Sequence, residues 1–271
     1  MGKYLVLGSS GFIGKNLCKY LKLLKQEVIE FDIKNSDDED LRKFDNLKLT
    51  QLIASCDFVF FLAFDVGGSK YLADCNKDFS FLLNNTRIIS NTFEVLKNSG
   101  KKFLFVSTYL TENLDHSYGL LKKVGEQFTS SIGGLVVRLY NIYGNEDISH
   151  RSHVIPDLIY QAKNQEYIKL KTNGVEERQF LYVEDCCKGL YVISQNYNDL
   201  LKQNSIIDLT SFEWVSVKNV AEIVSEIFNS ELKISNCEAD YNSKCVPNEA
   251  ILNLWKPTTN LKDGISKMIK E

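Results

Sequence analysis

A tyrosine and a lysine, Tyr118 and Lys122, stand four residues apart in a stretch with helical spacing, which places both side chains on one helical face. A free tyrosine has a pKa near ~10 and is a poor base at neutral pH. A neighbouring ammonium group and a bound nicotinamide cation both favour the phenolate and lower that pKa. These two residues are therefore predicted to move a proton on and off a substrate hydroxyl. The alternative is a surface pair without chemistry.

A hydroxyl pair, Ser107-Thr108, ends the apolar run that precedes this helix. Ligands of parallel sheets bind at the carboxyl ends of the strands. The Thr108 hydroxyl is therefore predicted to hydrogen-bond the substrate oxygen that loses or gains the proton. Thr108, Tyr118 and Lys122 form the predicted catalytic set.

A glycine-rich turn lies between the first apolar run and the first helical stretch, with the sequence GSSGFIG at 8–14. Glycines at this spacing allow a tight turn in which backbone N–H groups approach a pyrophosphate at a helix N-terminus. Asp32 ends the next strand, where a carboxylate accepts the hydroxyls of an adenosine ribose and repels a 2′-phosphate. NAD is therefore the predicted cofactor, and the alternative for Asp32 is a turn cap. The predicted contacts are Gly8, Ser10, Gly11, Phe12, Ile13, Gly14 and Asp32.

Strand-like and helical stretches alternate through the chain. Near-continuous apolar runs predict strands at 3–8, 27–32, 56–64, 101–108, 133–140, 178–183 and 205–209. Helical spacing predicts helices at 12–24, 79–98, from 118, 154–163, from 184, 216–229 and near the C-terminus. Such alternation predicts an α/β fold with a doubly wound parallel sheet covered on both faces.

The alternation is most regular in the first half of the chain, which suggests two structural units. Residues 1–150 are predicted to form an NAD-binding domain of Rossmann type, to which 176–209 return. Residues 151–175 and 210–271 are predicted to form a smaller C-terminal α/β lobe that binds the substrate. The charged run at 35–43 reads as a solvated turn.

The composition excludes several classes of protein. The chain has 271 residues and a formal net charge of −3, so no basic field predicts binding to nucleic acid or to a membrane surface. No apolar stretch approaches the roughly 18 residues that a membrane span needs. Seven cysteines without a CxxC pair, and three scattered histidines, predict no metal site. We expect reduced thiols and a cytoplasmic location.

Further motifs make the sequence similar to the extended short-chain dehydrogenase/reductase family, in its nucleotide-sugar epimerase and dehydratase branch. The resemblance runs nearly end to end. Besides the turn and Asp32, it is carried by FLAFDVGG (61–68), NNT (84–86), FVST (105–108), YGLLK (118–122), RLYNIYG (138–144), SHVIP (152–156), RQFLYVEDCCKGL (178–190) and LWKPTTNLKDGI (254–265).

The resemblance implies roles for individual residues. It gives Thr108, Tyr118 and Lys122 the proton relay and places Tyr118 and Lys122 against the cofactor as well. It implies further cofactor contacts at Asp40, Leu41, Leu62 and Ala63. It implies a nucleoside-diphosphate sugar as substrate, bound by Asn141, His153, Val154 and Arg178. It also implies a homodimer that pairs the helices around 85–98 and 118–131.

Departures from the family pattern narrow the implied chemistry. Dehydratases carry an acidic pair after the strand-end threonine, whereas this chain has Tyr109 and Leu110. The cysteine that GDP-mannose epimerases use has no counterpart between residues 76 and 185. The remaining reaction is NAD-dependent hydride transfer at C4 of the sugar, with overall epimerisation. The alternatives are a dehydrogenase or ketoreductase on the same substrates, GDP-linked sugars included, and an NAD-binding regulator without catalysis.

Three segments are shorter or poorer than the family pattern. The stretch from Asp32 to Asp40 is too short for a crossover helix, and only ten residues separate Thr108 from Tyr118. No arginine follows Arg178, so Lys244 is the candidate for a second cation on the diphosphate.

Overall fold

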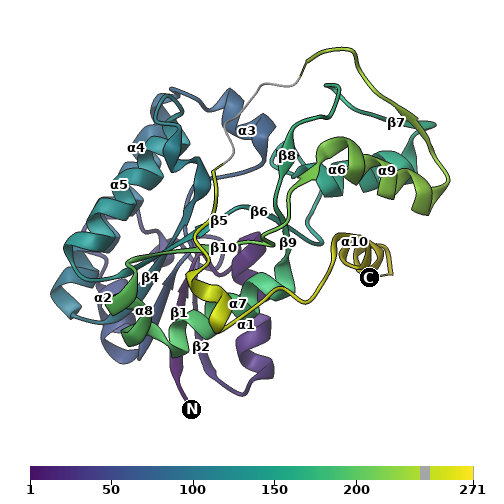
Figure 1. Cartoon of the computed structure of the whole chain (residues 1–271). Coiled ribbons are helices and arrows are strands. Elements are labelled where there is room, and N and C mark those ends of the chain that lie inside the picture. Colours follow the sequence, from purple (N-terminus) through teal and green to yellow (C-terminus); the bar gives the residue numbers. More distant parts are fainter. Residues whose placement is uncertain (239–244, 271) are drawn as a thin grey trace.

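The computed structural model of the protein describes residues 1–238 and 245–270. Its centre is a six-stranded sheet in which all neighbouring strands run parallel (Figure 1). In spatial order the strands are β2 (Glu27–Phe31), β1 (Lys3–Leu7), β3 (Phe58–Phe61), β4 (Lys102–Thr108), β5 (Leu135–Leu139) and β10 (Ile206–Leu209). The predicted α/β fold with a parallel sheet is therefore confirmed.

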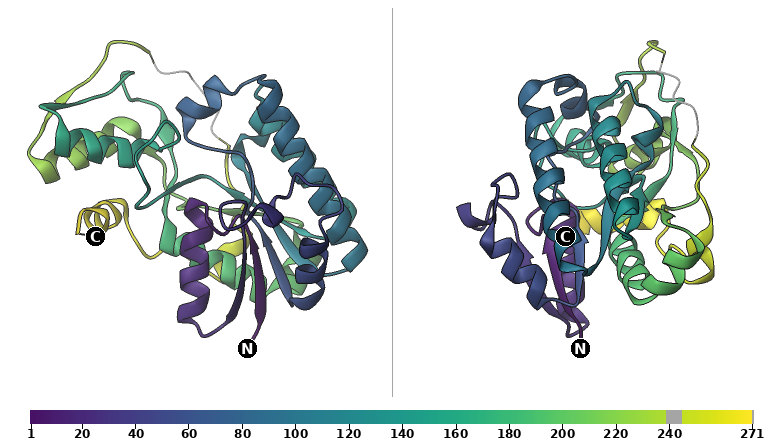
Figure 2. Two further views of the ribbon diagram at one scale, coloured as in Figure 1. Left: turned by 180° about the vertical axis from the view of Figure 1, so that it is seen from behind. Right: turned by 90° about the vertical axis from the view of Figure 1, so that its left-hand side faces the viewer.

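Alternating side chains of the strands divide the core into two layers. Tyr4, Val6 and Phe60 point to one face of the sheet, where they meet α1 (Phe12–Leu23), α7 (Val183–Gln195) and α8 (Tyr197–Gln203). Leu5 and Phe61 point to the other face, which is covered by α2 (Leu47–Ser55), α4 (Phe79–Ser99) and α5 (Ser117–Ser131). The views in Figure 2 show helices on both faces of the sheet.

The short connection after Asp32 explains why β2 is an edge strand of the sheet. That connection holds only the 3₁₀ turn η1 (Asp37–Glu39) before α2. The chain forms no strand outside β2, and after α2 it returns to the sheet as β3. The strand order is therefore that of the flavodoxin-type doubly wound sheet with one strand added beyond it. The prediction that this stretch is too short for a crossover helix is confirmed.

A smaller group of elements follows β5 and lies beside the sheet (Figure 1). Its helices are α6 (Val154–Asn164), α9 (Val217–Phe228) and α10 (Leu261–Lys270). Its short strands form three pairs: β6 (Asn141–Tyr143) with β9 (Phe180–Tyr182), β7 (Tyr167–Lys169) with β12 (Glu231–Lys233), and β8 (Glu177–Arg178) with β11 (Val215–Ser216). The remaining short elements are α3 (Ser69–Asp74), η2 (Tyr109–Glu112) and η3 (Ala250–Asn253).

Two segments differ from simple expectation. The single strand predicted at 178–183 is divided at Gln179, because Arg178 pairs with Val215 of β11 while Phe180 pairs with Asn141 of β6. The chain also returns to the sheet late: Asn248 donates from its backbone and side-chain nitrogens to Asp208 of β10, at 2.8 and 2.7 Å. The C-terminal region therefore contributes to the sheet domain as well as to the lobe.

Local sequence explains the ends of the helices that matter most. Asp78 caps α4 by accepting a hydrogen bond from the Phe81 N–H, and Gly100 ends this helix in the left-handed conformation. Asp185, in the first turn of α7, accepts hydrogen bonds from Thr258 and Thr259, so this carboxylate fastens the C-terminal segment to the sheet domain. Within the described residues, no helix is long and apolar enough to cross a membrane.

Candidate active site

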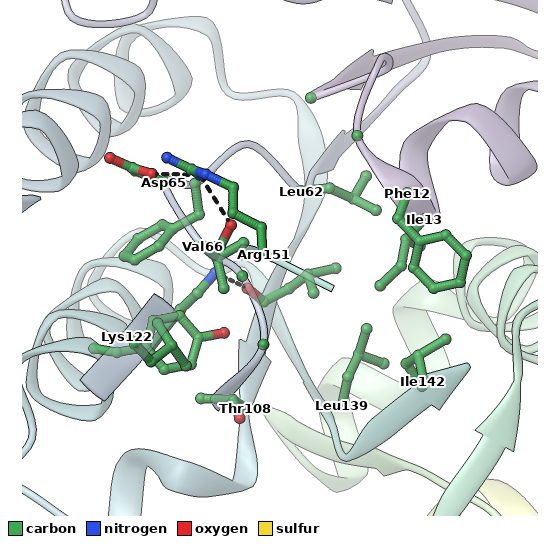
Figure 3. A pocket seen from close by; sticks show the side chains of 18 of the residues that line it. Phe12, Ile13, Leu62, Asp65, Val66, Thr108, Lys122, Leu139, Ile142 and Arg151 are labelled. Carbon is green, nitrogen blue, oxygen red and sulfur yellow. Dashed lines mark hydrogen bonds and ion pairs between the residues drawn. The ribbon is translucent and has the colours of Figure 1, made fainter. Parts of the chain in front are cut away.

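A cavity of about 1720 Å³ lies at the carboxyl ends of the central strands, between the sheet and the lobe (Figure 3). Pockets for one small ligand usually measure about 300–1,000 Å³, so this cavity has room for a dinucleotide and a second ligand. The predicted catalytic and cofactor-binding residues all line it: Gly8, Ser10, Gly11, Phe12, Ile13, Gly14, Asp32, Asp40, Leu41, Leu62, Ala63, Thr108, Tyr118 and Lys122.

At Gly8 and Gly14 of the glycine turn, a side chain would clash with the backbone. Gly8 has φ +89°, and a Cβ there would lie 2.7 Å from the Ala63 nitrogen. A Cβ at Gly14 would lie 2.0 Å from the Gly8 carbonyl oxygen. Gly11 precedes α1 without a capping side chain, so the first N–H groups of the helix remain available to an anion. This cradle fits the pyrophosphate of a dinucleotide.

Asp32 is held at the rim of this turn by backbone groups. Its carboxylate accepts hydrogen bonds from the Ser10 and Lys34 N–H groups, at 3.0 and 2.9 Å. Beneath it, the buried Glu39 accepts from the Asp32 N–H at 2.9 Å and pairs with Lys48 at 2.7 Å. Burial alone would raise the pKa of Glu39, but the Lys48 and Asp32 hydrogen bonds hold it below its usual value.

The charged run at 35–43 therefore contributes residues to the core and to the cavity wall. Glu39 is buried, and Asp40 and Arg42 line the cavity, so the prediction of a solvated turn is wrong for these residues. Arg42 holds Asp40 through Nε and Nη2 at 2.8 and 2.9 Å. Arg42 is thus a cavity residue that sequence reasoning did not identify, although its position next to the expected Asp40-Leu41 pair was a usable signal.

The two predicted hydroxyls lie near the end of β4. Thr108 is the last residue of that strand, and it lines the same cavity as Tyr118. Burial raises the pKa of the Tyr118 phenol well above its usual value, and the nearby Thr108 side chain opposes the shift. The Tyr118 ring packs edge-on against Phe64, with the ring centroids 5.8 Å apart. The Phe64 contact therefore orients the phenol ring near a second hydroxyl.

The short connection between these residues works because α5 sits unusually close to it. A Cβ at Gly119 would lie 2.3 Å from the Leu110 carbonyl oxygen, so only glycine permits this approach. The start of α5 is fastened by Asn76, whose Oδ1 accepts hydrogen bonds from the Ser117 N–H and hydroxyl, both at 3.0 Å. These contacts bring Tyr118 over the end of β4 although only ten residues separate it from Thr108.

Lys122 lies one helical turn further on and is almost completely buried. Its Nζ donates to the Val106 carbonyl at 2.7 Å and lies 3.9 Å from the centre of the Phe64 ring. Burial lowers the pKa of Lys122 to about 7, and the charge of Glu126 opposes that shift. The Lys122 Nζ lies 6.0 Å from the centre of the Tyr118 ring, so the amine and the phenol are neighbours on one face of α5.

This lowered pKa predicts a pH dependence of stability. An unfolded chain keeps the lysine pKa near ~10.4, so between about pH 7 and pH 10 the unfolded state binds more protons and stability rises with pH. Lys122→Met removes this contribution. We expect the free energy of unfolding of the wild type, relative to the variant, to rise by about 2 kcal/mol from roughly pH 7 to pH 9 in urea titrations.

The neighbouring Lys123→Met variant is the matched control, because Lys123 is partly exposed and pairs with Glu126 at 3.3 Å. It should keep the pH slope of the wild type. Equal slopes for wild type and Lys122→Met would contradict the buried position of the ammonium group.

A buried ion pair between β5 and α5 stabilises the end of β4. Arg138 of β5 donates through Nε and Nη2 to the two carboxylate oxygens of Glu126, at 2.7 and 2.8 Å. The Ser107 hydroxyl donates to the same carboxylate at 2.8 Å. Arg138 is therefore a structural residue with a bidentate partner. Glu126 in turn links β4, β5 and α5.

Three of the expected substrate residues line the cavity, namely Asn141, His153 and Arg178. The buried Asn141 Nδ2 has no hydrogen-bond partner among the described residues. The His153 Nδ1 lies 2.9 Å from the Glu146 carboxylate, which orients the imidazole. Arg178 donates through Nη1 to the Glu177 carbonyl at 2.8 Å. These groups remain able to contact a ligand.

The two other expected substrate residues have different outcomes. Val154 is not among the residues that line the cavity. It is the first residue of α6 and packs against the hydrophobic core, and its contact with a substrate stays a prediction. Lys244 lies outside the described residues.

Sequence reasoning missed a group of residues that line the cavity from distant parts of the chain. The Arg151 guanidinium bonds to the Asp65 carboxylate at 2.8 Å and to the Val66 carbonyl at 3.1 Å (Figure 3). It also lies over the Tyr71 ring, 3.9 Å from its centre. Only its type, one of five arginines in the chain, was a usable signal.

Another part of the cavity wall is formed by two stacked aromatic rings. Tyr109 stacks on Tyr140 with ring centroids 4.8 Å apart, and the Tyr140 hydroxyl lies 3.7 Å from the Cys245 sulfur. Tyr109 and Cys245 both line the cavity. The position of Tyr109 directly after Thr108 was the only sequence signal for this wall.

The glycine cradle, the acidic rim and the hydroxyls near a lysine are the parts of a dinucleotide-binding site, in a cavity with room for a second ligand. Comparison with known families agrees, because the model of the NAD dependent epimerase/dehydratase family matches residues 4–207. The chain belongs to this family, and it is an NAD-dependent enzyme of that class.

Similar proteins cover several activities within the family. The chain is 25% identical to GDP-mannose 3,5-epimerase 1 of Oryza sativa subsp. indica, over 96% of this chain and 79% of that protein. It is 25% identical to GDP-L-fucose synthase of Sinorhizobium fredii, over 97% and 92%. Among solved structures, WbmF of Bordetella bronchiseptica in complex with NADH superposes with a TM-score of 0.80 at 24% identity, over 99% and 91% of the two chains. The last similarity supports the fold.

Proposed function

We propose that the protein is an NAD-dependent 4-epimerase of a nucleoside-diphosphate sugar. The observation that carries this proposal is that Thr108, Tyr118 and Lys122 line the same cavity as the glycine cradle. A base, a hydroxyl donor and a hydride acceptor are the parts that reversible oxidation of an alcohol needs.

The residues divide the work as follows. Tyr118 as phenolate takes the proton of the sugar C4 hydroxyl, while Thr108 hydrogen-bonds the same oxygen. Lys122 favours the phenolate by its charge. NAD held by the glycine turn and Asp32 would supply the hydride acceptor and donor for C4. The proton that Tyr118 holds goes back to the oxygen as the keto sugar is reduced from its other face, which gives the epimer.

Elimination of water has less support in this cavity. The residues after Thr108 are Tyr109, whose ring is stacked on Tyr140, and Leu110, so no carboxylate follows the threonine. The homodimer expected from the family stays a prediction. Leu120, Val124 and Phe128 are partly exposed along α5 and supply an apolar face for it.

A second candidate is a ketoreductase or dehydrogenase on the same substrates, which the similarity to GDP-L-fucose synthase favours. The two differ in their cofactor balance. An epimerase regenerates NAD in each turnover, so we expect catalytic amounts of NAD to support complete conversion with no net change in NADH absorbance. Purified protein would be incubated with UDP- and GDP-hexoses, and the products separated by chromatography. Net NADH formation or consumption, in proportion to product, would instead establish the dehydrogenase or reductase.

A further inference from the structure

One wall of the substrate compartment is a short extended segment that ends at Arg178. β8 pairs antiparallel with β11, and the Val217 N–H donates to the Glu176 carbonyl at 3.0 Å, which extends the pairing by one residue. Side chains two residues apart on such a segment share a face and stand about 6.6 Å apart. Glu176 and Arg178 both line the cavity, whereas Glu177 between them does not. This segment therefore presents one carboxylate and one guanidinium to the same ligand.

The reacting phenol and this segment belong to one cavity, because Tyr118, Tyr109, Arg178 and Glu176 all line it. Glu176 lies two residues before Arg178, on the same face of the extended segment. A sugar at Tyr118 with its diphosphate at Arg178 would bring its nucleoside within reach of Glu176.

The Glu176 carboxylate is oriented but not neutralised. The Thr172 hydroxyl donates to it, with distances of 3.1 and 3.4 Å to the two oxygens, and Thr172 itself accepts from the Gly174 N–H at 3.2 Å. Within the described part of the chain, no lysine or arginine forms an ion pair with Glu176. An ionised carboxylate only accepts hydrogen bonds, so its ligand is a group with adjacent N–H or O–H donors.

We propose that Glu176 recognises the guanine base of a GDP-linked sugar, by accepting hydrogen bonds from the guanine N1–H and exocyclic amino group. Uracil and thymine present a single N–H between two carbonyl oxygens, and those oxygens would face the carboxylate unfavourably. Cytosine offers an amino group without an adjacent ring N–H. This assignment rests on the proposed function, because it needs a nucleoside-diphosphate sugar in the cavity.

The test is calorimetric binding of GDP, UDP and CDP to the NAD-saturated protein and to its Glu176→Gln variant. A bidentate carboxylate–base pair discriminates by on the order of 10- to 100-fold, so GDP should bind the wild type tighter than UDP or CDP by that factor. Glu176→Gln should reduce the preference to a few-fold. The Glu177→Gln variant removes the same charge from the neighbouring position outside the cavity and should keep the wild-type preference.

The outcomes separate the two proposals. Tighter or equal binding of UDP or CDP, or a GDP preference that Glu176→Gln leaves intact, overturns the guanine assignment while the proposed function stands. Binding of NAD without any of the three nucleotides overturns both. Thermal unfolding of each variant, expected within a few degrees of the wild type, shows that any loss of preference belongs to the carboxylate and not to misfolding.

Discussion

Replacing Tyr118 with Phe is expected to lower kcat by about 10³-fold on the sugar nucleotide, while NAD still binds. General acid–base groups contribute roughly 10²- to 10⁴-fold, and this variant removes the oxygen that we propose exchanges the proton. The ring remains, so its edge-on contact with Phe64 is kept and the cavity wall should not collapse. The measurements are kcat with saturating substrate and NAD affinity by fluorescence or calorimetry.

The matched control is Tyr143→Phe. Tyr143 is also buried, but its hydroxyl has no partner among the described residues and does not line the cavity. This variant should keep kcat within a few-fold of the wild type. If Tyr118→Phe retained near-normal turnover, the phenol would not be the base, and a role as a binding protein without catalysis would become the better explanation.

The parts of the site that the sequence predicts are those set by local geometry or by a rule of sheet topology. Gly8 and Gly14 are such a case, because a turn that excludes side chains leaves a direct mark on residue type. Thr108 and Tyr118 are another. A residue that ends a central parallel strand must face the ligand edge of the sheet, and helical spacing then fixes what lies beside it. These positions need no knowledge of long-range contacts.

The residues that sequence reasoning missed owe their position to partners far along the chain. Arg151 reaches Asp65 across 86 positions, and the Tyr140 hydroxyl meets Cys245 across 105. Neither pair has a spacing that a periodicity could reveal. Glu39 was misread for a related reason: a charged run normally faces water, but here Lys48 compensates the buried carboxylate. The substrate contact expected at Val154 stays a prediction, and the Val154 side chain packs against the hydrophobic core.

The contacts of Arg151 with Asp65, Val66 and Tyr71 also show how the sheet domain and the lobe meet at the cavity. The Gly68 N–H donates to the Arg151 carbonyl at 2.8 Å, and a Cβ at Gly68 would lie 2.2 Å from the Ser152 carbonyl oxygen. The segment after β3 therefore touches the start of the lobe directly. The backbone contact and the Arg151–Asp65 ion pair join the same two segments of the chain. This part of the cavity wall is therefore held by residues from the sheet domain and from the lobe (Figure 3).

Gly14→Ala is expected to weaken NAD binding by roughly 30- to 150-fold. The added methyl would sit 2.0 Å from the Gly8 carbonyl oxygen, and backbone on both sides leaves it no flexible neighbour to displace. Forcing one carbon into a filled space costs about 2–3 kcal/mol, which equals that change in Kd if the strain falls on the turn that holds the pyrophosphate. The measurement is NAD affinity by calorimetry, together with the free energy of unfolding without ligand.

Gly11→Ala gives the graded comparison, because a Cβ there would lie 3.3 Å from the same carbonyl oxygen. That separation is tight but can be relieved by a small shift, so the loss of NAD affinity should stay within roughly tenfold. A larger loss at Gly11 than at Gly14 would mean that the space above the helix N-terminus, and not the strand–helix contact, limits binding. Equal stability of both variants without NAD, combined with unequal affinity, would locate the strain in the bound state, where the turn must keep its shape around the two phosphates.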